Sequence, residues 1–96
     1  MILQLSPQRR DDLLTLKRTG DKLTINGTVF DFSQLTEGQT LPREAIDNEF
    51  ICGDVTRTDG KLIIPILLPH GAEASHEARF PEPITITTDG QVVLPI

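Results

Sequence analysis

The sequence predicts a mainly β protein built from antiparallel hairpins, and three observations lead to this fold class. Ile, Val and Thr, which favour strands, together number 25 of the 96 residues, whereas Ala occurs only four times. Dipeptides that favour tight turns divide the chain into short segments. Within these segments apolar and polar residues alternate, as they do in half-buried strands. We therefore expect a single domain over residues 1–96, folded as a small sandwich or partly open barrel.

The first third of the chain predicts an edge strand and a three-stranded meander. The expected strands are residues 1–5, at a sheet edge, and then 11–18, 22–26 and 28–32. Asn26-Gly27 favours a two-residue type I′ turn, because both positions of that turn require positive φ. The turn determines the register. It places Leu23 opposite Phe30 on an apolar face, and Lys22 opposite Asp31 on a polar face.

A second turn signal, Asp59-Gly60, predicts a hairpin of strands 50–58 and 61–68. The pairs expected from a two-residue turn are Val55 with Ile64, Gly53 with Ile66, Ile51 with Leu68, Thr56 with Ile63, Asp54 with Pro65, and Cys52 with Leu67. Both faces contain many apolar residues, so we expect this hairpin to be central to the core or covered on both sides. Because Pro65 has no N–H to donate, its strand should have a free edge or a bulge there.

The last turn signal, Asp89-Gly90, predicts a third hairpin of strands 84–88 and 91–95. Its expected pairs are Ile86 with Val93, Ile84 with Pro95, Thr87 with Val92, and Thr85 with Leu94.

Two polar segments interrupt the strand pattern and predict short helical turns. Residues 42–48 begin with Pro42, which suits the first position of a helix, and acidic residues follow it. Residues 72–78 are rich in Ala and Glu, and Pro81 would end a helical turn formed there. The aromatic Phe80 precedes that proline. We expect Phe80 to be buried in the core, as lone aromatic residues in small domains generally are, with an exposed contact as the alternative.

Composition excludes several classes of function. The net charge is −5, and the basic residues form no cluster longer than two, so we expect no binding to nucleic acid. The longest nearly apolar stretch, residues 62–69, is far shorter than the roughly 20 residues of a membrane span. Cys52 is the only cysteine, so no disulfide can form within the chain. These features indicate a cytoplasmic protein without a membrane segment.

One cluster of residues could bind a metal ion. His70, Glu73 and His76, followed by Glu77, have side chains that can ligate Zn²⁺. On a helix His70, Glu73 and Glu77 would share a face, with His76 beside it. The chain has neither a His-x-x-x-His nor a His-Glu-x-x-His motif, so a solvated polar loop is the simpler interpretation. We predict no cofactor.

The sequence contains no recognisable catalytic constellation. Cys52 with His70 or His76 could form a thiolate–imidazole pair, but the expected pairing places Cys52 in the middle of a strand. A cysteine there usually acts as a small buried hydrophobic residue. The chain has no Gly-x-Ser-x-Gly elbow, phosphate-binding loop or dinucleotide fingerprint. We therefore predict no catalytic residues and a protein that is not an enzyme.

Six stretches of distinctive sequence extend through nearly the whole chain. They are Leu5–Asp12 (LSPQRRDD), Leu23–Gly27 (LTING), Phe30–Phe32 (FDF), Leu41–Ile46 (LPREAI), Leu68–Gly71 (LPHG) and Phe80–Ile84 (FPEPI). Together they resemble a family of short proteins encoded by tailed bacteriophages and bacterial prophages. The resemblance implies a phage-derived origin and a role in tail or virion morphogenesis. It carries over no activity and no functional residue.

These observations favour a non-enzymatic phage or prophage protein, structural or involved in tail assembly, that acts through protein–protein contacts in the bacterial cytoplasm or in the virion. Exposed strand edges offer a route to a protein partner or to a homo-oligomer. One alternative is a small metal- or ligand-binding domain that uses the His70–Glu77 loop. Another is a regulator of a host protein.

Overall fold

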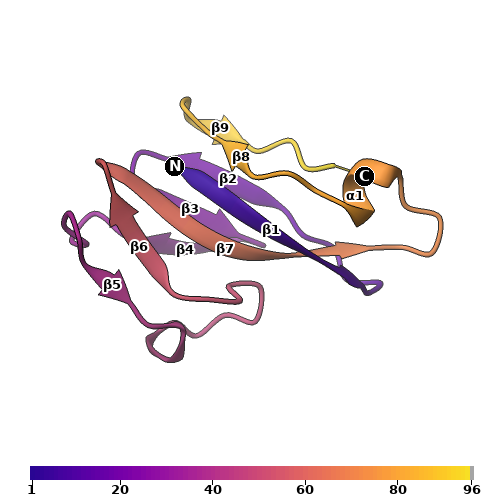
Figure 1. Ribbon diagram of the computed structural model, residues 1–96, viewed down its shortest axis with the longest axis horizontal. Helices are drawn as coiled ribbons and strands as arrows, with labels where there is room; N and C mark the ends of the chain where they lie inside the picture. The colour runs from indigo at the N-terminus through magenta and orange to yellow at the C-terminus, as the bar shows by residue number, and fades with distance from the viewer. Residues whose placement is uncertain (96) are drawn as a thin grey trace.

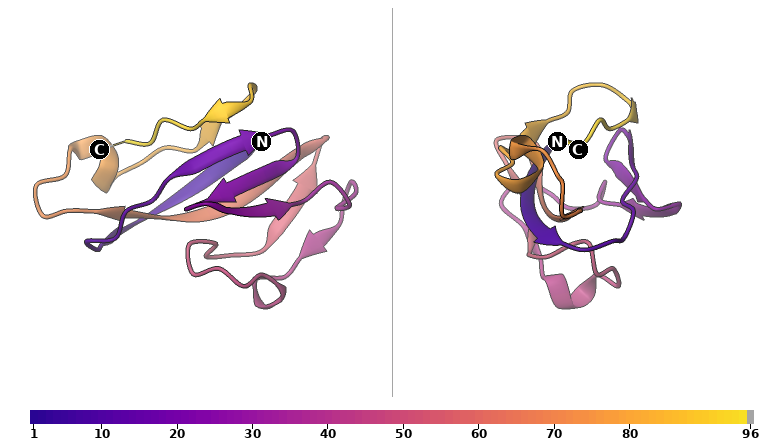
Figure 2. Two further views of the ribbon diagram at one scale, coloured as in Figure 1. Left: turned by 180° about the vertical axis from the view of Figure 1, so that it is seen from behind. Right: turned by 90° about the vertical axis from the view of Figure 1, so that its right-hand side faces the viewer.

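The computed structural model describes residues 1–95, which form two β-sheets that face each other as layers (Figures 1 and 2). The first sheet has the strand order β5-β6-β7-β1-β8, and the second has the order β4-β3-β2-β9. The strands are β1 (Ile2–Arg9), β2 (Leu16–Thr19), β3 (Lys22–Ile25), β4 (Thr28–Asp31), β5 (Thr40–Leu41), β6 (Val55–Thr58), β7 (Lys61–His70), β8 (Ile84–Thr85) and β9 (Gly90–Gln91). The mainly β fold predicted from the sequence is confirmed, as two open sheets rather than a closed barrel.

Two short helical segments accompany the sheets. A 3₁₀ turn, η1 (Arg43–Ala45), lies in the segment where a helical turn was expected, and Pro42 occupies its N-cap position. The helix α1 (His76–Arg79) begins after Ser75, whose hydroxyl accepts a hydrogen bond from the Ala78 amide, as N-cap residues do. Both helical turns are confirmed.

The core lies between the two sheets and receives side chains from both. Its fully buried members include Leu3, Val55, Ile64 and Ile66 from the first sheet, and Leu16, Leu23 and Ile25 from the second. β3 and β7 alternate buried and more exposed residues, which is the pattern of a strand with one face on the core.

The longest ladder in the structure joins β1 to β7 in parallel. Its eight residue pairs run from Ile2 opposite Ile63 to Arg9 opposite His70. β1 lies between β7 and β8, so the prediction of a short edge strand over residues 1–5 is wrong: the strand is longer and internal. Tight turns reveal only strands that are neighbours in sequence, and a parallel pair has no such turn.

The meander of β2, β3 and β4 is confirmed with its register. Leu23 lies opposite Phe30 and Lys22 opposite Asp31, and Asn26 and Gly27 have the positive φ angles of 48° and 87° that this turn requires. The first strand begins only at Leu16, later than expected.

The hairpin of β6 and β7 follows the predicted register near its turn and departs from it further away. Thr56 lies opposite Ile63 as expected, but the next bridge joins Ile51 to Ile66. The expected pairs Ile51 with Leu68, Gly53 with Ile66, Cys52 with Leu67, and Asp54 with Pro65 are therefore wrong, because the β6 side contains two extra residues.

Pro65 explains this bulge. In the expected register, residues 54 and 65 would exchange two backbone hydrogen bonds, and Pro65 has no N–H for one of them. Instead the Cys52 amide donates to the Pro65 carbonyl at 3.1 Å, and the Leu67 amide donates to the Phe50 carbonyl at 2.8 Å. A shift by two residues keeps every side chain on its original face, so Ile51 stays buried. The bulge expected at Pro65 is confirmed.

The predicted hairpin of residues 84–88 and 91–95 is wrong. β8 pairs with β1 in the first sheet, and β9 pairs with β2 in the second, so the segment connects the two layers (Figure 1). In a hairpin, Ile84 and Ile86 would point to one face and Val92 and Leu94 to the other. With the strands divided between the sheets, all four side chains pack against the shared core. The additional apolar burial explains why the local turn signal at Asp89-Gly90 does not determine the pairing.

A mostly buried arginine also holds the two layers together. Arg57 of β6 donates from Nη2 to the Asp21 carboxylate at 3.0 Å and to the Phe32 carbonyl at 3.3 Å, and from Nε to the Leu35 carbonyl. Asp21 and Phe32 flank the β3–β4 hairpin of the other sheet. The guanidinium therefore satisfies groups on both layers at once, in a site where its side chain is only 14% exposed.

We expect Arg57→Met to lower the free energy of unfolding by about 2–3 kcal/mol, because several acceptors lose a charged donor. Arg43→Met is the matched control, since Arg43 is exposed and its side chain makes no hydrogen bond in the described residues. Urea denaturation of both variants measures the difference. Equal effects of the two substitutions would contradict the role given to Arg57.

We also expect Gly53→Ala to destabilise the fold by about 1–2 kcal/mol, because a Cβ at this position would lie 3.0 Å from Cγ of Pro65. Gly71→Ala is the control, because nothing lies within 4 Å of the corresponding point. Thermal unfolding of Gly53→Ala, Pro65→Ala and the double variant should reveal positive coupling between the two sites. Simple additivity would show that the bulge does not depend on this contact.

Candidate interaction surfaces

An open cavity lies at the end of the molecule where α1 is found (Figure 1). Three segments that are distant in sequence enclose its volume of about 630 Å³: the connection after β1, the loop between β7 and α1, and the end of the described chain. We call this cavity the end groove. The residues that line it are Arg10, Asp11, Asp12, Leu13, Pro69, His70, Gly71, Ala72, Glu73, Ala74, Ala78 and Pro95. Its size is within the range of ligand-binding pockets in proteins.

The end groove contains one guanidinium, and that group already has partners. Arg10 donates to Glu49 at 2.8 Å and to Asp12, and its guanidinium lies 5.4 Å from the centre of the Phe50 ring. The hydrogen bonds to Glu49 and Asp12 raise the pKa of Arg10. Asp11 is in turn paired with Arg9 at 2.9 Å.

The structure brings together two of the three candidate metal ligands. His70 and Glu73 both line the end groove, whereas the ring of His76 packs against Phe80, with the ring centroids 4.9 Å apart. Nδ1 of His70 lies 3.0 Å from the carbonyl oxygen of Gly71. Among residues 1–95, no three His, Cys, Asp or Glu side chains are placed so that they could hold a metal ion.

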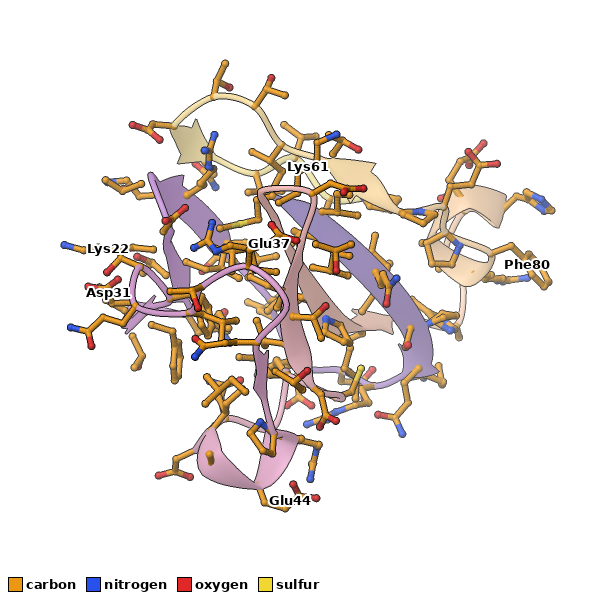
Figure 3. All side chains as sticks on the ribbon, turned by 60° about the vertical axis from the view of Figure 1, so that its left-hand side comes forward. Lys22, Asp31, Glu37, Glu44, Lys61 and Phe80 are labelled. Carbon is orange, nitrogen blue, oxygen red and sulfur yellow. The ribbon has the colours of Figure 1, made fainter. Side chains whose placement is uncertain are left out.

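The prediction that Phe80 is buried in the core is wrong. Its side chain is 69% exposed and extends into solvent beyond α1 (Figure 3). Phe80 is the C-cap residue of this one-turn helix, and the residue that α1 buries is Ala78. A four-residue helix has room for one inward-facing side chain, and here the small Ala78 occupies that position.

Cys52 lies in the bulge beside β7, where its amide pairs with the Pro65 carbonyl. It is half-buried and lies outside β6, so the expectation of a buried cysteine in the middle of a strand is wrong. His70 is the last residue of β7, five positions beyond Pro65, and His76 is the first residue of α1, so neither histidine lies beside Cys52 in the ladder.

A second candidate surface is the free edge of the second sheet. The edge strands β5, β8 and β9 have two residues each, whereas β4 has four. In the register of β4 with β3, Thr28 and Phe30 direct their backbone groups to β3, so Val29 and Asp31 direct theirs away from the sheet. Val29 is also 58% exposed. We call these two residues with Thr28 and Phe30 the β4 edge.

Prolines protect the other long backbone edges. Because the Arg10 amide donates to the His70 carbonyl, alternate residues of β1 face β7, and Pro7 faces the outer side. Because the Leu67 amide donates to Phe50 on the β6 side, Pro69 faces outward on the other edge of the same ribbon. Neither proline has an N–H, so neither position can donate to an added strand. The β4 edge has no proline.

The one charged residue of the β4 edge, Asp31, has a lysine as its cross-strand neighbour and accepts a hydrogen bond. Lys22 of β3 is the cross-strand partner of Asp31 of β4, and the two side chains lie close together at one side of the molecule (Figure 3). The Ser33 amide donates to Asp31 Oδ1 at 2.9 Å. This hydrogen bond lowers the pKa of the Asp31 carboxyl, and a hydrogen bond from the Ser33 hydroxyl makes a smaller contribution in the same direction.

The sequence predicted exposed strand edges but not which edge stays free, because the order of strands in a sheet depends on pairing between segments distant in sequence. The end groove was missed as a cavity, although two of its residues, His70 and Glu73, were singled out. Its walls come from three separate segments, and no local pattern reports their proximity.

No helix within residues 1–95 has the length and apolar character needed to cross a membrane. Comparison with protein-family models, with curated proteins and with solved structures finds no significant match to the chain.

We expect the Asp31 carboxyl to titrate below the ordinary range of aspartate, because the folded chain offers hydrogen bonds to its charged form. The stability that this adds should be present above the pKa of the unfolded chain and be lost as the pH falls through the folded pKa. A ¹³C NMR titration of the carboxyl measures the midpoint. Ser33→Ala should raise the midpoint only in part, because the backbone hydrogen bond from residue 33 remains. A midpoint in the ordinary range of aspartate in both proteins would show that these hydrogen bonds do not stabilise the charged carboxylate.

Proposed function

We propose that this chain is a non-enzymatic phage or prophage protein, structural or involved in tail assembly, that acts through protein–protein contacts. The observation that carries the contact role is the β4 edge, a four-residue strand with an unpaired side and no proline. The six sequence stretches that resemble tailed-phage proteins support the phage origin. Exposed strand edges of this kind pair readily with a strand of another chain.

The simplest partner for the β4 edge is a second copy. In a two-fold antiparallel arrangement, Val29 of each copy would exchange backbone hydrogen bonds with Asp31 of the other, since both residues direct these groups outward. Phe30 would then lie opposite its own copy. The two four-stranded sheets would become one continuous sheet.

Side chains favour this register over its neighbour. Phe30, which is half-buried at the edge of the core, would be covered by the same residue of the second copy. A register that placed Asp31 opposite Asp31 would bring two like charges together and is disfavoured. In the proposed register each Asp31 faces Val29 and keeps Lys22 beside it.

Sedimentation equilibrium tests this proposal, and Val29→Pro is the most specific variant. The substitution removes an N–H that faces outward and leaves the ladder with β3 intact. We expect the wild-type chain to dimerise between ~10 µM and ~1 mM, in the range of a small interface, and the variant to stay monomeric.

Thr85→Lys provides a control, because Thr85 is exposed and lies on β8 of the other sheet, away from the β4 edge. It should leave the dimer unchanged. A wild-type chain that is monomeric over the whole range, or a dimer that survives Val29→Pro, would refute association through the β4 edge.

A metal-binding role is the alternative, because His70 and Glu73 line one cavity. Elemental analysis of protein purified without added metal discriminates the two proposals. Stoichiometric Zn²⁺ and a melting temperature that falls with chelator would favour the metal site.

A further inference from the structure

We propose that the end groove binds the side chain of a lysine or arginine, presented by an aliphatic segment of a partner protein. This site is separate from the β4 edge and involves none of its residues. The shape of the groove, its apolar walls and the charges at its rim all favour such a guest.

The walls of the groove are small and apolar. Ala72, Ala74 and Ala78 come from the loop before α1 and from α1 itself, and Leu13 and Pro95 come from two other segments. Alanine and proline leave room for a guest while presenting an apolar surface to it. Leu13 is 85% exposed, a degree of exposure that leaves most of its apolar surface available to a guest. Walls of this kind suit the methylene stem of a lysine or arginine, which packs on apolar surface while its head group stays in water.

The charges at the rim select the sign of the guest. Three carboxylates line the groove, those of Asp11, Asp12 and Glu73, against one guanidinium. Asp11 is already paired with Arg9 and Asp12 with Arg10, so Glu73 is the carboxylate that a cationic guest would meet. The guanidinium of Arg10 is already bonded to Asp12 and Glu49 and lies over Phe50, so it is not available to an anionic guest. Glu73 has no ion pair within the described residues. The groove therefore attracts a cation and disfavours an anion.

The charge of the whole chain argues against a second copy as the occupant. The net charge is −5, so two copies approaching through this acidic rim would repel each other. A basic, aliphatic segment of a different protein meets both requirements, the apolar walls and the negative rim. Long-range attraction would also accelerate its association at low ionic strength.

Peptide titration followed by ¹⁵N NMR tests this proposal on the full chain. The probes are acetyl-AVKVA-amide and acetyl-AVEVA-amide, which differ in one charged side chain. We expect the lysine peptide to shift the amide signals of residues 10–13 and 69–74 in a saturable manner, and the glutamate peptide to bind about tenfold more weakly. In 1 M NaCl, where the Debye length is about 3 Å, this preference should largely disappear.

Two variants test the assignment further. Glu73→Lys should weaken binding of the lysine peptide about fivefold, in line with the loss of an exposed ion pair. Glu77→Lys reverses a nearby charge that does not line the groove and should have no effect. Both residues are exposed, so neither change threatens the fold. Ala72→Trp, which fills the groove from an exposed position, should abolish the shifts for both peptides.

Three outcomes would overturn the proposal. The first is the absence of any saturable shift at residues 10–13 and 69–74. The second is equal binding of the two peptides at low salt, because the rim would then select no charge. The third is a shift of the same signals by Zn²⁺ alone that blocks the lysine peptide, which would assign the groove to a metal ion instead.

Discussion

The parallel ladder between β1 and β7 organises the fold. It joins the beginning of the chain to residues 63–70, and β6 and β8 attach to its two sides. Leu3, Ile64 and Ile66 of this ladder are fully buried and form the floor of the core. The second sheet packs on that floor. Without the ladder, β1 and β8 would no longer be joined to the β6–β7 hairpin, and the meander would lose much of the apolar surface on which it packs.

Both candidate surfaces follow from this arrangement. β1 and β7 extend beyond the sandwich as a two-stranded ribbon, and α1, the loop before it and the connection after β1 gather around its end to form the end groove (Figure 2). Prolines at positions 7 and 69 keep the outer edges of the ribbon from pairing with another strand. On the opposite layer β4 has no such protection. Because proline blocks some strand edges and β4 keeps a free one, strands of other chains can pair with the sheets at few positions.

Local signals in the sequence determined local structure well. Asn26-Gly27 and Asp59-Gly60 both form the expected two-residue turns, and Pro65 marks the bulge that interrupts β6. The prediction was wrong wherever distant segments compete for the same strand. Asp89-Gly90 has an equally good turn motif, yet burial of Ile84, Ile86, Val92 and Leu94 on the shared core outweighs the local preference. The end groove lies outside sequence reasoning for the same reason.

Native-state amide hydrogen exchange measures whether the ladder between β1 and β7 is the most stable part of the fold. Backbone alternation directs the amides of Gln4, Ile64 and Ile66 into this ladder. We expect these amides to exchange only through global unfolding and to be the slowest in the protein. Slower exchange in β2, β3 and β4, together with separate opening of β1, would show that the meander is the stable unit and that the ladder is added to it.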